Sequence, residues 1–557
     1  MASSGASMSG GMAIVQALIA NGVDTLFGLP GAQLYPLFDA LQQQRLHIRT
    51  YTARHEQTCG YMAFGYARAT GRPGVYAVVP GPGVLNTAAA LVTALGCNAP
   101  VLCITGEVPS AFLGRGRGHL HELPDQLATL RSITKWAARI ERPADAPQIV
   151  NEAFRQMLGG RPGPVAIAMA WDLMAARGEV ALLPRAAIPA ALPPAPQEIA
   201  AAARLIAAAK RPMIMTGSGA QHAAAAVGAL AEELNAPVAA FRGGRGVVAE
   251  DHLLGVSSFA AYRMWPETDV LIGIGSRLEM PYMRWTGMMA LIDRPQPPPL
   301  LIRIDIDPAE MRRLVPHAAI TADADAGTRA LLAAVRRARR GSREARNGRA
   351  VRAAVAAAKS SARTEYDKVQ PQMAYLDAIR AVLPRDGFFV GEVSQMGFAS
   401  YFGFPVYEPR TYVSEGYQGT LGFGFPTALG VKAAHPARPV VAVTGDGGFM
   451  FAAQELATAV QEDLALTVLV FNNRAYGNVL RDQRTRYDNR IIGALLDNPS
   501  FVALAQVFGI AAERVTSPEA LKGVLAAALG SGKPALIEVE IARGSEVSPW
   551  EFIHPAH

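Results

Sequence analysis

Cysteine is scarce in this chain of 557 residues, which contains three: Cys59, Cys97 and Cys103. They form no Cys-x-x-Cys pair, and an odd number cannot make an even disulfide framework. Their surroundings are typical of small buried apolar side chains in a reducing compartment. We therefore expect a cytoplasmic protein without structural disulfides.

Lysine is also scarce, since seven of the 53 basic residues are lysine and the rest arginine. The net charge of +7 raises the question of nucleic-acid binding. However, the arginines do not alternate with aromatic residues as they do in recognition modules. We expect no nucleic-acid partner, and we interpret the charge as general solubility charge or attraction for an acidic substrate.

The chain lacks an uninterrupted apolar run long enough for a membrane span. Its long uncharged stretch, residues 73–106, is broken by Pro80-Gly81-Pro82-Gly83 and by Asn98-Ala99-Pro100. These breaks predict a buried strand, loop, helix and strand. The first residues, Met1 to Gly11, lack the basic and apolar segments of a signal peptide, and we expect a frayed tail there.

The length predicts about three domains, because single cores stop growing well short of 557 residues. Apolar strand patterns alternate with helical patterns, which favours an α/β fold with three doubly wound parallel sheets. The expected divisions are a first domain over residues 1–180, a proline-rich linker over 181–197, a middle domain over 198–340, a second linker over 341–369 and a last domain over 370–557. The basic stretch Arg336 to Arg352 is expected to be a solvated helix, linker and helix.

Individual strands are predicted from short apolar runs. In the first domain they should end near Gly28, Thr50, Val79 and Thr105. In the middle domain they should lie near Pro212–Thr216, Val238–Ala240, Val270–Gly273 and Leu301–Asp305.

The most informative motif is Gly445-Asp446-Gly447-Gly448, which follows the apolar run Val440 to Val443. A second run, Leu466 to Phe471, leads to Asn472-Asn473. Neighbouring parallel strands would bring Asp446 and Asn473 to one sheet edge, where both can bind Mg²⁺ with the carbonyl of Ala475. Gly445, Gly447 and Gly448 would let backbone N–H groups approach a diphosphate. The alternative is an ordinary tight turn with an aspartate cap.

This motif resembles the signature of thiamine diphosphate-dependent enzymes. From about residue 10 to its end the chain is similar to the acetolactate synthase and benzaldehyde lyase branch of that superfamily. Four further stretches carry the resemblance: Phe27 to Ala32, Arg54 to Gln57, Pro80 to Gly83 with Asn86, and Gly419 to Gly424. It implies a pyrimidine-binding first domain, a diphosphate-binding last domain, thiamine diphosphate with Mg²⁺, and at least a homodimer, with a homotetramer favoured.

Glu56 matches the carboxyl group that contacts N1′ of the cofactor pyrimidine in this superfamily. It opens a helix rich in alanine, glycine and aromatic residues, so its surroundings should hold little water. Burial raises a carboxyl pKa and would favour a proton shared with the pyrimidine. The alternative is a helix-start glutamate stabilised by the helix dipole.

The resemblance implies further cofactor contacts. Leu421 matches the apolar residue that separates the two cofactor rings, although it could also be a core leucine. Met396 stands where relatives often carry histidine in the loop that touches the diphosphate. The full set of implied cofactor-binding residues, beyond the glycines of the motif, is Pro30, Gly31, Pro82, Asn86, Ser394, Gln395, Met396, Gly419, Leu421, Tyr476 and Gly477.

Two departures bear on the substrate. His121 stands where relatives usually have glutamine, so it could transfer protons near neutrality, with Glu122 as one candidate partner; the alternative is a surface loop histidine. Gln33 and Asn478 are expected to face each other across the substrate pocket. Together with the loop arginines Arg115 and Arg117 they favour a polar or anionic substrate.

The flavin-binding and second-substrate motifs of acetolactate synthase are also replaced. The chain has Val256-Ser257-Ser258-Phe259 and the segment Gly275 to Pro281 at the corresponding places. We therefore do not expect FAD, nor the acetolactate reaction itself.

The resemblance thus implies a thiamine diphosphate- and Mg²⁺-dependent lyase or transferase acting on a 2-oxo acid or 2-hydroxy ketone, as a decarboxylase or carboligase. One alternative is a 2-hydroxyacyl-CoA lyase or oxalyl-CoA decarboxylase, whose CoA phosphates the basic surface would hold. Another is a cofactor-binding regulatory subunit. Glu56 argues against the regulatory role, because simple binding would not need a carboxyl group at N1′.

Overall fold

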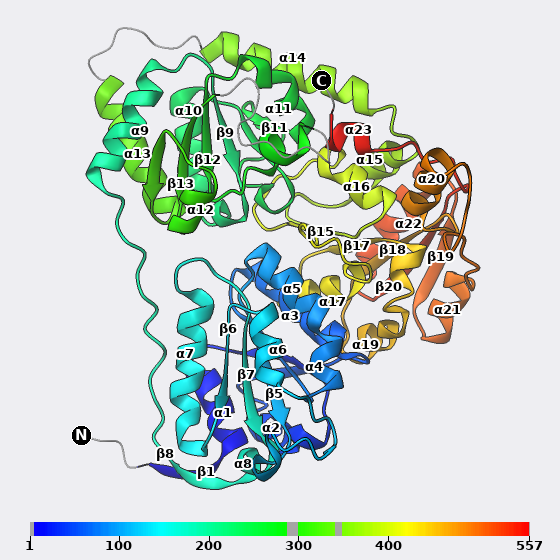
Figure 1. Cartoon of the computed structure of the whole chain (residues 1–557). Coiled ribbons are helices and arrows are strands. Elements are labelled where there is room, and N and C mark those ends of the chain that lie inside the picture. The colour runs from blue at the N-terminus through cyan, green and yellow to red at the C-terminus, as the bar shows by residue number, and fades with distance from the viewer. Residues whose placement is uncertain (1–4, 287–298, 340–347, 556–557) are drawn as a thin grey trace.

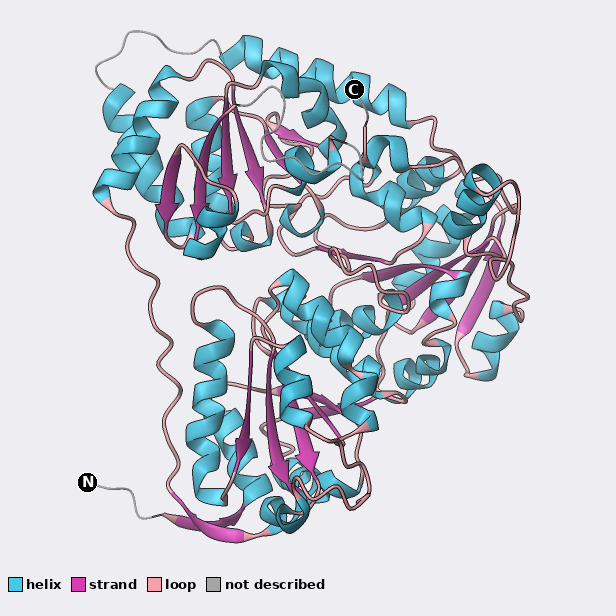
Figure 2. Ribbon diagram, viewed as in Figure 1, coloured by secondary structure: helices cyan, strands magenta, loops and turns pink. Residues whose placement is uncertain are grey.

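The computed structural model describes residues 5–286, 299–339 and 348–555, which form three α/β domains (Figure 1). Each domain has one six-stranded parallel sheet flanked by helices (Figure 2). The central strands are almost continuously buried, as in parallel sheets covered on both faces. The predicted fold class is therefore confirmed.

The N-terminal sheet has the strand order β3-β2-β4-β5-β7-β6. Its strands are β2 (Thr25–Gly28), β3 (Arg49–Thr52), β4 (Gly74–Val78), β5 (Val101–Glu107), β6 (Trp136–Ile140) and β7 (Val165–Ala170). Its helices are α1 (Gly10–Ala20), α2 (Tyr35–Gln43), α3 (Glu56–Thr70), α4 (Pro82–Asn86), α5 (Ala88–Cys97), α6 (Gln126–Ile133), α7 (Ala146–Leu158) and α8 (Trp171–Ala175). The predicted strand ends agree with this sheet to within two residues. The stretch 73–106 forms β4, α4, α5 and β5, so the predicted strand, helix and strand are present, and the predicted loop contains the short helix α4.

The expected frayed tail at the N-terminus is wrong beyond residue 5. Residues of β1 (Ala6–Ser9) pair antiparallel with β8 (Arg177–Val180). Ser9 then caps α1, because its hydroxyl accepts a hydrogen bond from the Met12 N–H at 3.1 Å. The pairing partner lies about 170 positions away, so local composition gave no sign of the strand.

The middle sheet has the order β11-β10-β9-β12-β13-β14. Its strands are β9 (Pro212–Thr216), β10 (Val238–Ala240), β11 (Gly255–Val256), β12 (Val270–Ile274), β13 (Leu300–Asp305) and β14 (Ala318–Thr321). Its helices are α9 (Pro196–Ala208), α10 (Ala224–Leu234), α11 (Ser258–Met264), α12 (Pro308–Arg313), α13 (Ala324–Arg339) and α14 (Gly348–Tyr366). Counted within the domain, the strand order is that of doubly wound nucleotide-binding sheets, with its reversal between β9 and β12.

The C-terminal sheet repeats the strand order of the N-terminal one, as β16-β15-β17-β18-β20-β19. Its strands are β15 (Phe388–Gly391), β16 (Tyr412–Val413), β17 (Val440–Gly445), β18 (Thr467–Asn472), β19 (Ala511–Val515) and β20 (Ala535–Glu540). Its helices are α15 (Gln372–Val382), α16 (Gln395–Gly403), α17 (Gly424–Ala434), α18 (Asp446–Phe449), α19 (Leu456–Gln461), α20 (Gly477–Arg486), α21 (Phe501–Val507), α22 (Pro518–Gly530) and α23 (Trp550–Ile553).

The segments predicted as linkers differ from each other. After β8 the chain runs without helix or strand until α9 begins at Pro196, and Figure 1 shows it as a long extended segment along one side of the molecule. The predicted second linker instead contains α14, which packs against α11 of the middle domain. Gly341 of the basic stretch lies outside the described residues.

No helix in the described ranges has the length and apolar character needed to cross a membrane.

The N-terminal and C-terminal domains pack closely through α3 and α17. A Cβ atom on Gly65 would lie 2.2 Å from the Thr427 carbonyl oxygen, and one on Gly430 would lie 2.0 Å from the Met62 carbonyl oxygen. These helices therefore approach at distances that only glycine allows. Nearby, Glu455 and Glu462 accept hydrogen bonds from the backbone N–H groups of Arg54 and Thr52.

We predict that Gly65→Ala destabilises the protein, because the added methyl group must push the two helices apart. The expected loss is about 1–3 kcal/mol of unfolding free energy, measured from urea unfolding curves. Gly228→Ala in α10 is the control, because no atom lies within 4 Å of its Cβ position. It should leave stability unchanged or raise it by up to about 1 kcal/mol. Equal midpoints for the two variants would contradict the close packing.

Candidate functional site

The carboxyl ends of β17 and β18 bring the predicted metal ligands together. The two strands are paired in parallel, with Gly445 opposite Phe471, so Asp446 and Asn473 follow at the same edge of the sheet. Both side chains are buried, Asp446 with 2 % of its surface exposed. The Ala475 N–H donates to Asn473 Oδ1 at 3.0 Å. It also lies near the Asp446 carboxyl group, where it opposes the rise that burial causes in the pKa of that group. Their role as metal ligands stays a prediction.

Two residues that the sequence analysis missed complete this group. Asn498 donates from Nδ2 to Asp446 Oδ2 at 2.7 Å, and Asn473 donates from Nδ2 to Glu546 Oε2 at 2.5 Å. Both lie in segments without regular structure, far along the chain from the residues they contact. Neither belongs to a motif with a spacing that could have indicated the contact.

The electrostatics of this group favour a cation. Burial raises the pKa of Asp446 to about 6, although the hydrogen bond from Asn498 opposes that rise. Burial likewise raises the pKa of Glu546 to about 7, and repulsion from Asp446 adds to the effect while Arg481 opposes it. Within the described ranges there is no cluster of three or more His, Cys, Asp or Glu side chains suited to a metal. A divalent ion here would therefore need amide, carbonyl and ligand phosphate oxygens, which is how Mg²⁺ is usually bound.

Glycines next to the acidic group let neighbouring side chains pack close to the backbone. A Cβ atom on Gly447 would lie 2.5 Å from Tyr476 Cε1, and one on Gly477 would lie 2.7 Å from Asn473 Nδ2. The Gly445 Cβ position is 3.3 Å from the side chain of Ser394, which caps α16 by accepting from the Gly397 N–H. The structure thus gathers the predicted phosphate-binding segments around the first turns of α16 and α20, where backbone N–H groups favour an anion.

One buried acceptor in this cradle lacks a protein partner. Gln395 Oε1 is buried and has no hydrogen-bond partner among the described residues. An unmade buried hydrogen bond is costly and commonly marks a place where a ligand binds. Met396 differs from its neighbours, because its side chain is buried in the apolar core with 1 % exposed. Only its backbone is placed to contact a phosphate.

The loop predicted to touch the pyrimidine lies beside α5. Thr420 Oγ1 lies 3.3 Å from Thr93 Oγ1, while Gly419 is exposed and Leu421 partly buried. Leu421 is therefore not a core leucine in this chain. The next residue, Gly422, donates its N–H to Glu392 Oε1 at 2.5 Å, which ties the loop to the end of β15.

The other predicted residues gather at the carboxyl edge of the N-terminal sheet. Glu56 begins α3 just after β3 and accepts a hydrogen bond from Asn86 Nδ2 at 3.0 Å. Pro30 and Gly31 follow β2, and Pro82 begins α4 after β4. A Cβ atom on Gly83 would lie 3.7 Å from Glu56 Cγ. Glu56 itself is partly exposed in the single chain, so the expected water-poor surroundings are not complete there.

His121 contacts Gln33 and, within the described residues, not Glu122, which was one of its candidate partners. His121 Nδ1 lies 3.1 Å from Gln33 Oε1, and Gln33 Nε2 donates to the Leu120 carbonyl at 3.1 Å. Glu122 instead accepts from the Gly116 and His119 N–H groups and holds the loop in shape. Because Gln33 Oε1 can only accept, Nδ1 of His121 carries the proton and a neutral ring leaves Nε2 as the free acceptor.

The expectation that Gln33 and Asn478 face each other across the pocket stays a prediction, because the two residues belong to different groups of one chain. Gln33 belongs to the N-terminal group, whereas Asn478 Oδ1 accepts from Trp550 Nε1 at 2.5 Å and also from Arg481. Arg115 and Arg117 are exposed in their loop. The chain therefore holds two separate groups of predicted residues, and in the part that the structure describes no hydrogen bond joins Glu56 to the Asp446 group.

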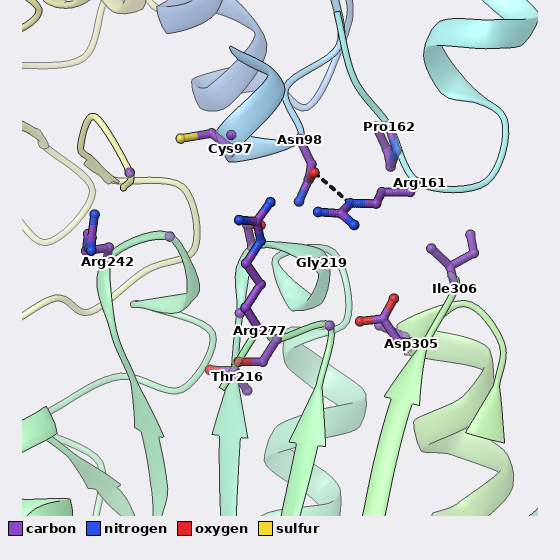
Figure 3. Close-up of a pocket in the computed structure, with 18 of the residues that line it drawn as sticks. Cys97, Asn98, Arg161, Pro162, Thr216, Gly219, Arg242, Arg277, Asp305 and Ile306 are labelled. Atoms are coloured by element: carbon purple, nitrogen blue, oxygen red, sulfur yellow. Dashed lines mark hydrogen bonds between the residues drawn. The ribbon is translucent and has the colours of Figure 1, made fainter. Parts of the chain in front are cut away.

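A separate cavity of about 450 Å³ lies where the middle domain meets the other two (Figure 3). It opens at the carboxyl ends of β9, β12 and β13, where the strand order reverses. Arg161 and Arg242, which line it, pair with Glu310 and Glu279. The other arginines of its lining, Arg68, Arg277 and Arg410, form no ion pair with a carboxylate in the described ranges. Burial and the charge of Arg68 lower the pKa of Arg410 to about 10.

Comparisons with known proteins match one family domain to each of the three α/β domains. Residues 8–129 match the N-terminal TPP binding domain of thiamine pyrophosphate enzymes, residues 199–331 match the central domain, and residues 392–539 match the C-terminal TPP binding domain. A probable 2-ketoarginine decarboxylase of Pseudomonas aeruginosa is 36% identical over 96% of this chain and 94% of its own length. A probable acetolactate synthase large subunit of Methanocaldococcus jannaschii is 34% identical, over 96% and 92%. Acetolactate synthase isozyme 1 large subunit of Escherichia coli is 30% identical, over 99% and 98%.

We predict that Asp446→Asn stabilises the protein when divalent cations are removed with a chelator. The raised pKa means that the unfolded chain loses this proton first, so the wild type loses stability as the pH rises from 3.8 to about 6 and stays lower above it. The variant should be more stable by about 1–3 kcal/mol near pH 8 and nearly equal near pH 3, below both pKa values, as measured by thermal unfolding.

Asp39→Asn is the control for this prediction, because Asp39 is an exposed carboxylate on α2 that accepts from Gln43. It should show no such pH-dependent gain. If Asp446→Asn were less stable than the wild type near pH 8, the claim that the buried Asp446 charge destabilises the metal-free protein would be wrong.

Proposed function

The chain belongs to the thiamine pyrophosphate enzymes, and from that premise we propose that it is a thiamine diphosphate- and Mg²⁺-dependent enzyme that breaks or forms a carbon–carbon bond at the carbonyl carbon of a 2-oxo acid or 2-hydroxy ketone. The observation that carries the proposal is the buried group of Asp446, Asn473 and Ala475 beside a glycine-lined cradle. When bound, the cofactor supplies the electron sink for the bond cleavage.

The residues of the C-terminal domain fit the diphosphate end of the cofactor. Asp446, Asn473 and the Ala475 carbonyl would hold Mg²⁺, whose positive charge would offset the buried carboxylate. Backbone N–H groups near Ser394 and Gly477 would bind phosphate oxygens, and the unpaired Gln395 Oε1 marks a further contact. The glycines let Tyr476, Asn473 and Ser394 pack close to the backbone at this place.

The residues of the N-terminal domain fit the pyrimidine end. Glu56 would hold a proton at N1′, with its carboxyl group oriented by the hydrogen bond from Asn86. This arrangement favours an enzyme over a regulatory subunit, since binding alone does not require a positioned carboxyl group. His121 Nε2 would give or take a proton at the substrate, while Gln33 fixes the ring through Nδ1.

We propose that each complete site combines the Glu56 group of one subunit with the Asp446 group of another, in a homodimer or a larger homo-oligomer. Two features support this. No hydrogen bond joins the groups within the described part of one chain, and large apolar side chains are exposed beside both. Leu85 precedes Asn86 with 47% exposed, and Phe451 follows the Gly-Asp-Gly segment with 53% exposed. Exposed apolar side chains of this kind are typical of surfaces that a partner covers.

Decarboxylation of a 2-oxo acid is the reaction we favour within this class. The similarity to a 2-ketoarginine decarboxylase extends over nearly the whole chain, and the replaced motifs disfavour the acetolactate reaction. Lyase activity on CoA thioesters remains the second candidate, because Arg68, Arg277 and Arg410 line a cavity without carboxylate partners.

The test is CO2 release from a panel of 2-oxo acids, including a guanidino-bearing one, with and without acceptor aldehydes. Parallel assays use CoA thioesters. Release from one or more 2-oxo acids supports the proposal. Turnover of CoA thioesters alone would favour the second candidate, and no turnover of any substrate would contradict an enzymatic role.

We predict that Glu56→Gln still binds thiamine diphosphate but loses most activity, because the amide cannot hold a proton at N1′ as a carboxyl group does. The expected fall in the exchange rate of the cofactor C2 proton is about 10²- to 10⁴-fold, measured by quenched-flow NMR. Glu122→Gln is the control, because Glu122 holds the loop from outside the site. A change below about fivefold in Glu56→Gln would contradict the role.

We predict that His121→Gln slows aldehyde release more than substrate binding and shifts products towards carboligation. Glutamine can accept and donate hydrogen bonds but cannot deliver a proton at neutral pH. The measurement is the ratio of aldehyde to ligation product across pH. Identical ratios and pH profiles for wild type and variant would return His121 to the status of a loop residue.

We predict that the purified protein carries no stoichiometric flavin. The prediction depends on the replaced flavin-binding motif and not on a lack of space. The cavity beside β9 and β12 has room and positive charge for a phosphate-bearing ligand. An absorption spectrum of the freshly purified protein is the measurement. Flavin absorbance near one equivalent per chain would overturn the prediction and revive the synthase assignment.

A further inference from the structure

Glu392 is a buried carboxyl group that no motif indicated. It follows β15, has 1 % of its surface exposed, and lies between two segments of the proposed cofactor site. Its Oε1 accepts from the Gly422 N–H at 2.5 Å, in the loop that carries Gly419 and Leu421. Its Oε2 accepts from the Thr444 hydroxyl, two residues before Asp446. One carboxyl group therefore joins the loop predicted to contact the pyrimidine to the strand that ends at the metal site.

The glycines around Glu392 leave just enough space for its side chain. A Cβ atom on Gly448 would lie 2.4 Å from Glu392 Oε1, and one on Gly424 would lie 2.9 Å from Glu392 Cβ. Gly448 belongs to the α18 segment and Gly424 begins α17. The carboxyl group thus fills the space between the two segments, so its removal would leave a cavity between them.

No cation accompanies this charge. In the part of the chain that the structure describes, Glu392 forms no ion pair with lysine, arginine or histidine, and a second carboxyl group, Glu415, acts on it. Burial raises the pKa of Glu392 to about 7, while hydrogen bonds from Thr444, Gly422 and Phe423 oppose the rise. A buried carboxyl group without a cation costs stability, so an apolar residue of similar size would serve the core better. Its presence at this place requires a reason other than stability.

We propose that Glu392 is a positioning residue that sets the loop of Gly419 and Leu421 against the Asp446 segment, so that both ends of one cofactor are held at the correct spacing. This inference rests on the proposed function. Glu392 does not touch the cofactor itself, because its carboxyl group is enclosed by Gly422, Gly424, Thr444 and Gly448. Its effect passes through the backbone of the two segments.

Glutamine at this position should keep the connection. Its amide oxygen would accept from the Gly422 N–H, and its NH2 group would donate to Thr444 Oγ1. That hydroxyl, which donates to Glu392 in the wild type, would then donate to the Gly445 carbonyl, which is 3.1 Å away. Alanine would keep neither contact and would leave the Gly422 N–H buried without a partner.

The test measures thiamine diphosphate binding by calorimetry at saturating Mg²⁺, in the full-length protein. Glu392→Ala should weaken binding about tenfold or more, whereas Glu392→Gln should stay within about threefold of wild type. Glu310→Ala is the matched control, because Glu310 is a buried carboxylate of the middle domain, paired with Arg303 and Arg313. It should lower thermal stability without changing cofactor affinity.

A double-mutant cycle separates positioning from a general loss of stability. If Glu392 acts through the loop, Glu392→Ala and Leu421→Ala should be non-additive in cofactor binding by about threefold or more. The pair Glu310→Ala and Leu421→Ala should be additive. Additive effects in the first pair, or unchanged affinity in Glu392→Ala, would overturn the inference. Failure of the wild type to bind the cofactor would instead overturn the proposed function.

Discussion

The parallel pairing of β17 with β18 is the interaction on which the proposed site depends. Because Gly445 stands opposite Phe471, the residues that follow the two strands leave the sheet together. Asp446 and Asn473 can then share one ligand although they are separated in sequence. A shift of one residue in this pairing would turn the two side chains to opposite faces of the sheet. The repeated strand order of the N-terminal sheet provides a second edge of the same kind, at which Glu56 and Asn86 meet.

Three carboxyl groups near the carboxyl edge of the C-terminal sheet form no ion pair with arginine or lysine in the described residues. They are Asp446, Glu546 and Glu392, and burial raises the pKa of each. Other carboxylates are paired with arginine, as Glu310 is with Arg303 and Glu250 with Arg245, or accept from backbone N–H groups, as Glu455 does. The buried charges at the carboxyl edge of the C-terminal sheet therefore lower stability, and a bound cation and its ligand would balance them.

Much of the fold followed from sequence because buried parallel strands are short apolar runs that end in turn residues. β9 and β10 have the predicted bounds, and β17 and β18 lie within two residues of theirs. The placement of Asp446 and Asn473 at one edge of the sheet followed from the same rule. Asn498, Glu546 and Glu392 did not, because each reaches the site through a contact between distant segments. Gln33 was not among the candidate partners of His121 for a related reason, since it lies 88 positions away in sequence.

The claim that the site is built from two half-sites of different subunits can be tested by complementation. Chains carrying Glu56→Gln and chains carrying Asp446→Ala, each inactive alone, would be co-expressed with different tags, and the mixed dimer purified through both. If the half-sites combine between subunits, one of the two sites in the mixed dimer contains intact Glu56 and intact Asp446. The account predicts about half of the wild-type activity per dimer. A mixed dimer as inactive as its parents would contradict it.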